Sequence, residues 1–188
     1  RISEDEVEEI KTWYSDMRCA SIEVTCSGPS LGEIVTTGHL VDPSTETALA
    51  GYRQTFRIWR GRPFLEVEME LDTQKNPDGD PWSCMYAARW AWNDSSASIS
   101  QSICGAAQPI QMQRIETPEF IELASSDTDR TTILPIGQPF HRKAGPRMID
   151  SLLVVEGEPE RKFRFLIGID QHFPMQAALD SLSPVVPI

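Results

Sequence analysis

The side chains that could support acid–base or metal chemistry are few and scattered. The chain has three histidines, His39, His141 and His172. None belongs to an H-E-x-x-H motif, and the sequence has no G-x-S-x-G elbow, glycine-rich phosphate loop or dinucleotide fingerprint. A zinc site would also need carboxylates or thiolates that converge on the histidines. We therefore expect no catalytic residue, metal site or cofactor within this chain.

Three glutamates could in principle act as the paired carboxylates that hydrolyse glycosides. Glu66, Glu68 and Glu70 alternate with apolar residues, which places them along one face of a strand. This pattern favours a solvated acidic stripe over a catalytic pair.

Arg89 is the one charged residue in the segment 82–92. If its strand is buried, the guanidinium needs a carboxylate or carbonyl partner, so we expect a structural ion pair.

A second cationic feature is the segment 139–143, which contains His141, Arg142 and Lys143. Gly137 and Gly145 flank it, and this predicts a surface loop whose cations could contact a ligand. Trp59 and Phe64 are further candidates, because exposed aromatic rings near a hairpin turn can stack on sugar rings.

Two neighbouring strands and their turn are the clearest structural signal. Segment 63–71 has apolar residues at odd positions, and segment 48–59 alternates in the same way. If Arg60 and Gly61 form a two-residue turn with positive φ at Gly61, Phe56 opposes Leu65 and Arg53 opposes Glu68.

Segment 82–92 is apolar on both faces apart from Arg89. It predicts a central strand, covered by a second layer, and therefore a broad sandwich. Further strands are predicted at 18–26, 33–41, 97–104, 110–115, 119–124, 131–136, 147–155 and 162–170. We expect the last two to form a hairpin closed by residues 157–159. Residues 3–17 show helical spacing and predict a short N-terminal helix.

Composition limits the possible partners. The formal net charge of −11 argues against a nucleic-acid surface. No apolar run is long enough to span a membrane. The four cysteines lack the spacing of a metal or redox site, so we expect free thiols. Free thiols and the lack of a signal-peptide pattern favour a cytoplasmic protein. We expect a helical lead-in over 1–17 and a single all-β sandwich domain over 18–188, as a piece of a longer protein.

Several segments together resemble the C-terminal β-sandwich region of glycoside hydrolase family 38, the α-mannosidases. They are Trp59 to Pro63, the strand to Asp72, Met85 to Trp92 and His141 to Lys143. The resemblance covers about residues 33–170. It implies a galactose-mutarotase-like supersandwich of two large antiparallel sheets, the accessory half of a retaining α-mannosidase. It also implies that zinc and the nucleophile lie in a preceding catalytic domain, which is the partner of this one.

In some family members an arginine from an H-R-R-like segment reaches the sugar site. The matching stretch implies that Arg142, with His141 beside it, binds the α-mannoside substrate, and that the fragment alone is inactive. A stand-alone carbohydrate-binding module that uses Trp59, Phe64 or the acidic stripe is an alternative. A mutarotase-like enzyme would need His141 or His172 paired with a glutamate, and no spacing indicates this.

Overall fold

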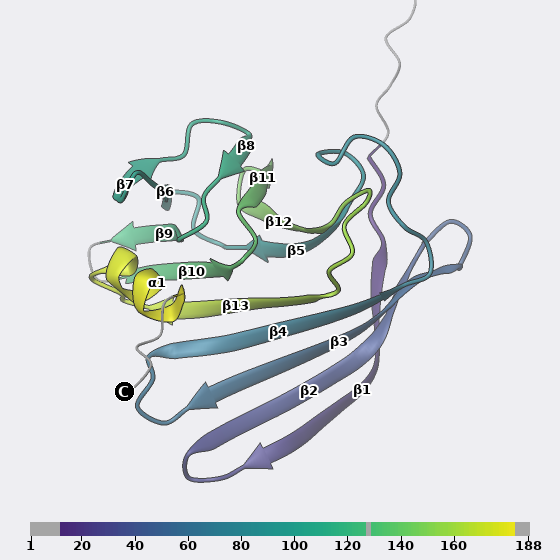
Figure 1. The fold of residues 1–188 in the computed structure, drawn as a ribbon, viewed down its shortest axis with the longest axis horizontal. Helices are drawn as coiled ribbons and strands as arrows, with labels where there is room; N and C mark the ends of the chain where they lie inside the picture. Colours follow the sequence, from purple (N-terminus) through teal and green to yellow (C-terminus); the bar gives the residue numbers. More distant parts are fainter. Residues whose placement is uncertain (1–11, 127–128, 183–188) are drawn as a thin grey trace, which may run out of the picture.

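The computed structural model describes residues 12–126 and 129–182, which form two antiparallel sheets and one short helix (Figure 1). The nine strands of the large sheet lie in the order β1 (Asp16–Ser27), β2 (Leu31–Val41), β3 (Ala48–Trp59), β4 (Phe64–Thr73), β13 (Lys162–Ile169), β10 (Asp129–Ile136), β9 (Ile121–Ser126), β6 (Ser98–Ile103) and β7 (Ala106–Pro109). The small sheet has the order β5 (Tyr86–Ala91), β12 (Met148–Val154), β11 (Phe140–Gly145) and β8 (Arg114–Glu116). Helix α1 spans Pro174–Leu182.

The all-β class is confirmed, but the expected size of the sheets and the expected N-terminal helix are wrong. The sheets are unequal, with nine and four strands instead of two large sheets. The predicted helix over residues 3–17 does not form where the structure describes it, because residues 12–15 are irregular and β1 begins at Asp16. Residues 3–11 of that prediction lie outside the described part of the chain.

The hairpin of β3 and β4 has the predicted faces in a different register. Phe56 lies opposite Val67 and Arg53 lies opposite Glu70, which is a shift of two residues from the expected pairing. The backbone N–H of Arg62 donates to the Trp59 carbonyl, and Gly61 has the expected positive φ of 81°. Pro63 has no backbone N–H to donate to β3, so the loop between β3 and β4 is longer than the expected two-residue turn. A two-residue shift leaves every side chain on its predicted face.

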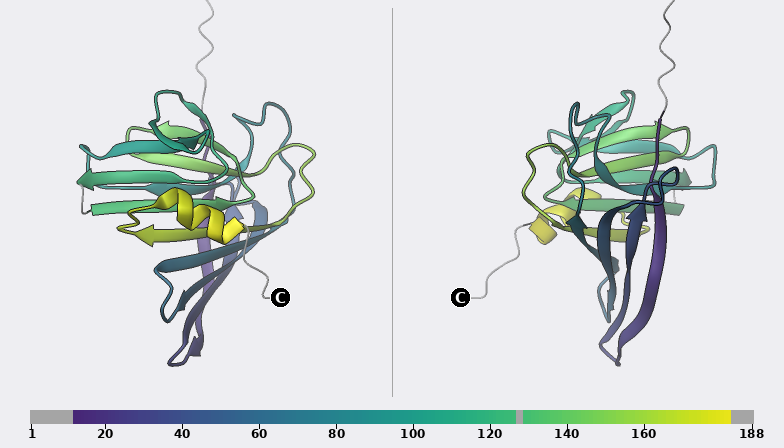
Figure 2. Two further views of the ribbon diagram at one scale, coloured as in Figure 1. Left: turned by 60° about the vertical axis from the view of Figure 1, so that its left-hand side comes forward. Right: turned by 90° about the vertical axis from the view of Figure 1, so that its right-hand side faces the viewer.

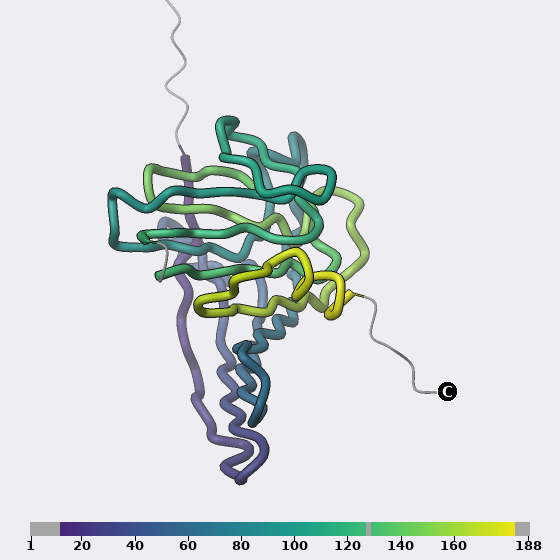
Figure 3. Tube along the Cα trace, turned by 90° about the vertical axis from the view of Figure 1, so that its left-hand side faces the viewer, coloured from purple at the N-terminus to yellow at the C-terminus, as the bar shows by residue number. Residues whose placement is uncertain are grey.

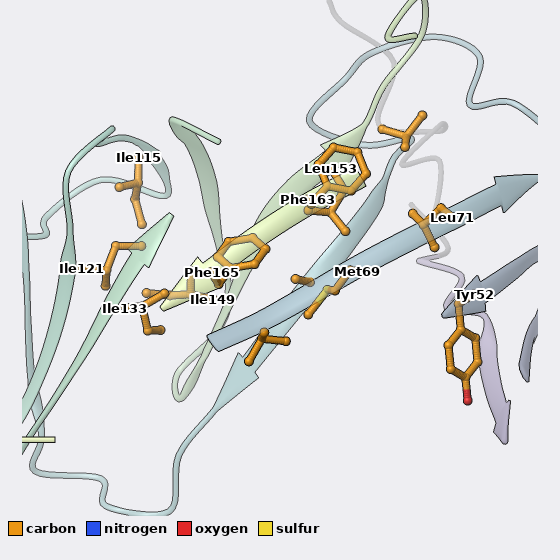
Figure 4. Close-up of a cluster of buried hydrophobic side chains, with 13 residues drawn as sticks. Tyr52, Met69, Leu71, Ile115, Ile121, Ile133, Ile149, Leu153, Phe163 and Phe165 are labelled. Atoms are coloured by element: carbon orange, nitrogen blue, oxygen red, sulfur yellow. The ribbon is translucent and has the colours of Figure 1, made fainter. Parts of the chain in front are cut away.

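The main core lies between the two sheets (Figure 4). Val67, Met69 and Leu71 of β4 point into it, as their alternation predicts. They meet Phe163 and Phe165 of β13 from the same sheet. Ile149 and Leu153 of β12 and Ile115 of β8 supply the opposing layer.

A second, smaller core lies on the other face of the large sheet, under α1. Phe64, Leu134 and Leu166 pack there with Ala178 of the helix. The sequence analysis missed α1, although Pro174 occupies its first position and Gln176 bonds Asp180 one turn later. Figure 2 shows α1, in yellow, lying over β10 and β13.

Segment 82–92 is not the central strand that its apolar residues predict. Only Tyr86–Ala91 forms a strand, β5, and it is the edge of the small sheet. Ala87 and Ala91 are exposed. Alanine exposes little apolar area, so an alanine-rich face is compatible with solvent in a way that a leucine-rich face is not.

Two connections also differ from expectation. The predicted loop at 139–143 is strand β11, in the interior of the small sheet. The predicted hairpin of the last two strands does not form, because β12 belongs to the small sheet and β13 to the large one. Their link, with Gly157 at φ 80°, crosses between the layers.

The large sheet extends far beyond the small one. Strands β1, β2 and β3, which we call the wing, project away from the two-layer body (Figures 1 and 3). One cross-strand row shows the consequence: it runs from Val24 through Ile34, Phe56 and Val67 to Phe165. Exposure falls from 68% at Val24 and 42% at Ile34 to 2% at Val67 and 0% at Phe165. One apolar face therefore begins in solvent and ends in the core.

A candidate binding face on the small sheet

Three arginines and one aspartate form a row across the outer face of the small sheet. In register, Arg89 of β5 lies opposite Asp150 of β12, Asp150 opposite Arg142 of β11, and Arg142 opposite Arg114 of β8. Directly opposed residues point to the same face, so the four side chains lie side by side. We call this set the arginine row. Its formal charge is +2 on a chain of net charge −11.

Asp150 is the centre of the arginine row. Its Oδ1 accepts from Nε of Arg89 at 2.7 Å, and its Oδ2 accepts from Nη2 of Arg89 at 2.8 Å and from Nη2 of Arg142 at 2.9 Å. The residue is only 1% exposed. Burial alone would raise the pKa of this carboxyl, but the hydrogen bonds from the two guanidinium groups outweigh burial and hold it below its usual range. The ion pair expected for Arg89 is thus present.

Aromatic rings flank the arginine row. The guanidinium of Arg89 lies 4.3 Å from the ring centre of Tyr14, and that of Arg114 lies 5.2 Å from the ring centre of Trp82. Arg142 donates from Nη1 to the Trp82 carbonyl at 2.8 Å. Phe140 contacts Trp82 edge-on, with ring centres 6.1 Å apart, and is itself 46% exposed.

A hollow of about 360 Å³ adjoins this face and has Tyr14 in its lining. Trp13, Lys75, Met85 and Tyr86 are among the residues that line it. The aromatic and cationic groups together suit a ligand that is rich in hydroxyl or anionic oxygens, since guanidinium groups donate to oxygen and rings stack on sugar faces.

His141 and Arg142 are neighbours in the chain but lie on opposite faces of β11. His141 points inward and is completely buried. Its Nδ1 lies 2.8 Å from Oγ of Ser151, and its Nε2 lies 3.2 Å from the Thr117 carbonyl. The geometry fits a neutral ring in which Nε2–H donates to Thr117 and Nδ1 accepts from Ser151.

The pair of His141 and Ser151 has the atoms of a nucleophile–base dyad but lacks access. Both residues are 0% exposed, and Ser151 also accepts a hydrogen bond from the Trp90 indole at 2.9 Å. Burial lowers the pKa of His141 to about 4. The pair therefore ties three strands together inside the core, where no substrate can reach it.

The other sequence candidates lie elsewhere. Trp59 is 37% exposed at the end of β3, and Phe64 packs in the core under α1. Glu66 and Glu68 bind Arg57 across the strands, and Glu70 binds Lys162 at 2.7 Å. The acidic residues thus alternate with basic ones on the outer face of the large sheet, as a charged ladder. Within the described residues, no three His, Cys, Asp or Glu side chains are grouped so as to hold a metal.

The sequence analysis missed Asp150, Arg114 and Trp82. A signal for Asp150 was present: it is the one charge in the strand Met148–Val154, which is otherwise uncharged, as Arg89 is in its own strand. Two lone opposite charges in two apolar strands favour pairing of those strands. Arg114 and Trp82 lie in segments that the sequence analysis predicted as strands, 110–115 and 82–92, but neither pattern indicates that they lie beside Asp150.

Comparison of the chain with models of known protein families finds no match, and comparison with curated proteins finds none either. The four cysteines are free thiols. Among the described residues, no helix has the length and hydrophobicity needed to cross a membrane.

Proposed function

We propose that this chain is a non-catalytic β-sandwich domain of a zinc-dependent, retaining α-mannosidase-like glycoside hydrolase. In this proposal it supports a catalytic domain of the same parent chain and contributes the outer face of the small sheet to the sugar site. The zinc and the reacting carboxylate belong to that catalytic domain, and α-mannosides are the substrate class. The resemblance of residues 33–170 to family 38 supplies the mannose part of the proposal.

The uncovered inner face of the wing is the observation that carries the supporting role. Met17, Ile22, Val24, Ile34 and Ile58 are between 42% and 69% exposed on β1 to β3. An apolar surface of this kind, continuous with a core, is typical of a face that another domain or subunit covers. The catalytic domain is the proposed cover.

The arginine row supports the contribution to the sugar site. Arg142 is the residue that the resemblance points to, and its side chain belongs to the outer face and is 19% exposed. His141 is sealed in the core, so in this proposal it orients β11 and does not touch sugar.

The first test is to read the gene upstream of Arg1. An open reading frame that encodes several hundred further residues, with His and Asp residues suited to zinc, is the expected result. That upstream polypeptide and this chain would then be produced separately. Neither alone should cleave an aryl α-mannoside, and mixing them should restore activity. A start codon close to Arg1 would overturn the proposal.

The second test compares two arginines in the complete parent enzyme. Arg142→Ala should raise KM or lower kcat. It should also lower the melting temperature, because Asp150 loses a partner. Arg57→Ala is the control, since it removes an arginine ion pair on the outer face of the large sheet, outside the arginine row. Equal kinetic losses in both variants would remove Arg142 from the sugar site.

A stand-alone carbohydrate-binding module remains the second candidate, because Trp82 and Phe140 present aromatic surface beside the arginine row. Titration of the isolated chain with methyl α-mannoside, followed by tryptophan fluorescence, separates the two functions. Saturable binding that Trp82→Ala abolishes and Trp59→Ala preserves would favour the module. No change at millimolar sugar favours the supporting role.

A further inference from the structure

Among the described strands, β1 has a hydrogen-bonded neighbour on one side only, at the end of the nine-stranded sheet. It is 12 residues long, and its sequence, DMRCASIEVTCS, contains neither proline nor lysine. Proline, lysine and short length are the usual devices that keep an edge strand from pairing with another chain. The edge has two bulges, after Cys19 and after Val24, as its protective device.

The first bulge changes which residues share a face. Cys19 pairs with Gly38 and Ser21 with Thr37, so Ala20 is the extra residue. Met17, Cys19, Ile22 and Val24 therefore lie on the inner face, although their numbering switches from odd to even. Arg18, Ser21 and Glu23 lie on the outer face with Ala20.

This switch makes β1 complementary to itself. Two copies of β1 placed antiparallel about a two-fold axis between Ala20 and Ser21 bring Arg18 opposite Glu23 of the second copy. On the inner face, Met17 then opposes Val24 and Cys19 opposes Ile22. A shift by one residue in either direction sets Arg18 against an apolar inner-face residue, Ile22 or Val24. In the unshifted register, Arg18 meets the opposite charge of Glu23, and the inner-face pairs Met17–Val24 and Cys19–Ile22 are apolar.

We infer that the wing edge is a homodimer interface, in which β1 pairs with β1 of a second copy of this chain and joins the two nine-stranded sheets into one. The interface is isologous, as two-fold pairing requires. Ile22 and Val24, which are 69% and 68% exposed in the single chain, gain apolar neighbours in the dimer. Because it uses the strand edge and not the inner face of the wing, this inference does not depend on the proposed function.

A disulfide placed across the interface tests the register. Ile22→Cys sets a thiol opposite the native Cys19 of the second copy. Opposed Cα atoms in an antiparallel ladder lie about 4.5–5.5 Å apart, within the roughly 4.4–6.8 Å that a disulfide spans. The variant is made in a Cys104→Ser background, which removes the other exposed thiol. Diamide is the oxidant, and it accepts the two hydrogens released as each S–S bond forms.

The expected result is a covalent dimer with Ile22→Cys. The dimer should disappear when Cys19→Ser is added. Val24→Cys is the matched control, since Val24 has the same exposure and face but lies opposite Met17, and it should remain uncrosslinked. Light scattering of the unmodified chain should give twice its mass of 21.1 kDa. A mass of 21.1 kDa at every concentration tested, or equal crosslinking of Val24→Cys, would overturn the inference.

Charge exchange provides a second measurement that needs no covalent bond. Glu23→Arg sets two arginine side chains against each other at both symmetry-related ends of the interface, and it should raise the dimer Kd roughly two- to thirty-fold. Adding Arg18→Glu restores opposite charges and should restore most of the affinity. Arg18 also binds Glu46 within its own chain, so Glu46→Gln is the control for loss of that contact. If Arg18→Glu with Glu23→Arg is no tighter than Glu23→Arg alone, the proposed register is wrong.

Discussion

His141 and Arg142 differ in environment because successive residues of a strand point to opposite sides of the sheet. His141 faces the core and stays neutral between Ser151 and Thr117, while Arg142 faces outward and binds Asp150. The sequence placed both in one cationic cluster, since in a loop both would face solvent. The strand separates them, and it turns one into a core hydrogen-bond group and the other into part of a surface row.

The buried His141 predicts a pH dependence of stability. Its pKa is near 4 when folded and about 6.5 when unfolded, so the unfolded chain binds more protons between these values. The free energy of unfolding should therefore fall as pH drops from 6.5 to 4, by up to about 3 kcal/mol, and stay constant above 6.5. Urea denaturation at several pH values measures it.

His141→Gln is the control for that prediction. The variant should lose the pH dependence above about pH 4.5, whatever its stability at pH 7. The carboxyls whose pKa values lie below their usual range, such as Asp150 and Glu33, titrate below this window. If the two chains show parallel pH curves across this window, His141 is accessible to protons in the folded state.

Asp150 predicts a large effect from a small substitution. Asp150→Asn keeps the side-chain shape but leaves the guanidinium groups of Arg89 and Arg142 without their carboxylate. Removing one member of a buried ion pair costs about 3–5 kcal/mol, and partial exposure of both arginines reduces this to roughly 2–3 kcal/mol. Guanidinium chloride denaturation at neutral pH measures the loss.

Asp72→Asn is the comparison for Asp150→Asn, because Asp72 is exposed on β4. We expect it to change the free energy of unfolding by less than about 0.5 kcal/mol. Because the folded pKa of Asp150 lies below the unfolded one, its contribution is complete above about pH 4 and disappears as pH falls through the folded pKa. Equal effects of the two substitutions would contradict a structural role for the arginine row.

At the scale of the elements, alternation predicted the faces of strands better than their neighbours. Val67, Met69 and Leu71 point into the core as expected, because period two depends on local geometry alone. The position of β5 at an edge depends on β12, whose Asp150 pairs with Arg89 from 61 positions away. Local pattern carries no information on such a partner, so the apolar segment 82–92 was placed at the centre of a sheet.

Two glycines of β2 predict opposite responses to the same substitution. A Cβ on Gly38 would lie 2.0 Å from the Arg18 carbonyl oxygen and 2.7 Å from the Tyr52 hydroxyl, so the strand or the ring must move. Gly38→Ala should lower the free energy of unfolding by about 1–3 kcal/mol or more. Gly32→Ala meets no atom within 4 Å and should be neutral or stabilising by up to about 1 kcal/mol. Thermal denaturation of both variants measures the difference in stability. Equal melting temperatures would mean that Tyr52 does not pack on β2.

At the scale of the whole molecule, the core between the two sheets includes residues of β4, β13, β10 and β9 and reaches Tyr52 of β3. It leaves Ile22, Val24, Ile34 and Ile58 of the wing exposed. The sequence analysis predicted two layers because segment 82–92 is apolar on both faces, although this segment supplies only the edge strand β5. It could not predict that four strands would cover only part of nine, since Ile22, Val24 and Ile34 have the same alternation as covered residues. Periodicity identifies an apolar face, but the topology decides whether the same chain covers it.

Exposure falls along the row from Val24 to Phe165, so the same substitution at two of its positions can measure how much of the face is covered. Valine and threonine have the same shape and strand preference, so Val→Thr changes only a methyl to a hydroxyl. Val67→Thr buries an unpaired hydroxyl in the core and should cost about 1–3 kcal/mol. Val24→Thr, in the same row at 68% exposure, should change the free energy of unfolding by less than about 0.5 kcal/mol.

Both variants are measured by urea denaturation at the lowest concentration that gives a signal, where self-association contributes least. A cost at Val24 equal to that at Val67 would mean that the isolated chain covers its own wing and leaves no open apolar face for another domain. A small cost at Val24 together with a large cost at Val67 means that the wing face is free in the single chain. The burial of that face would then have to come from a partner, as the supporting role in a larger enzyme requires.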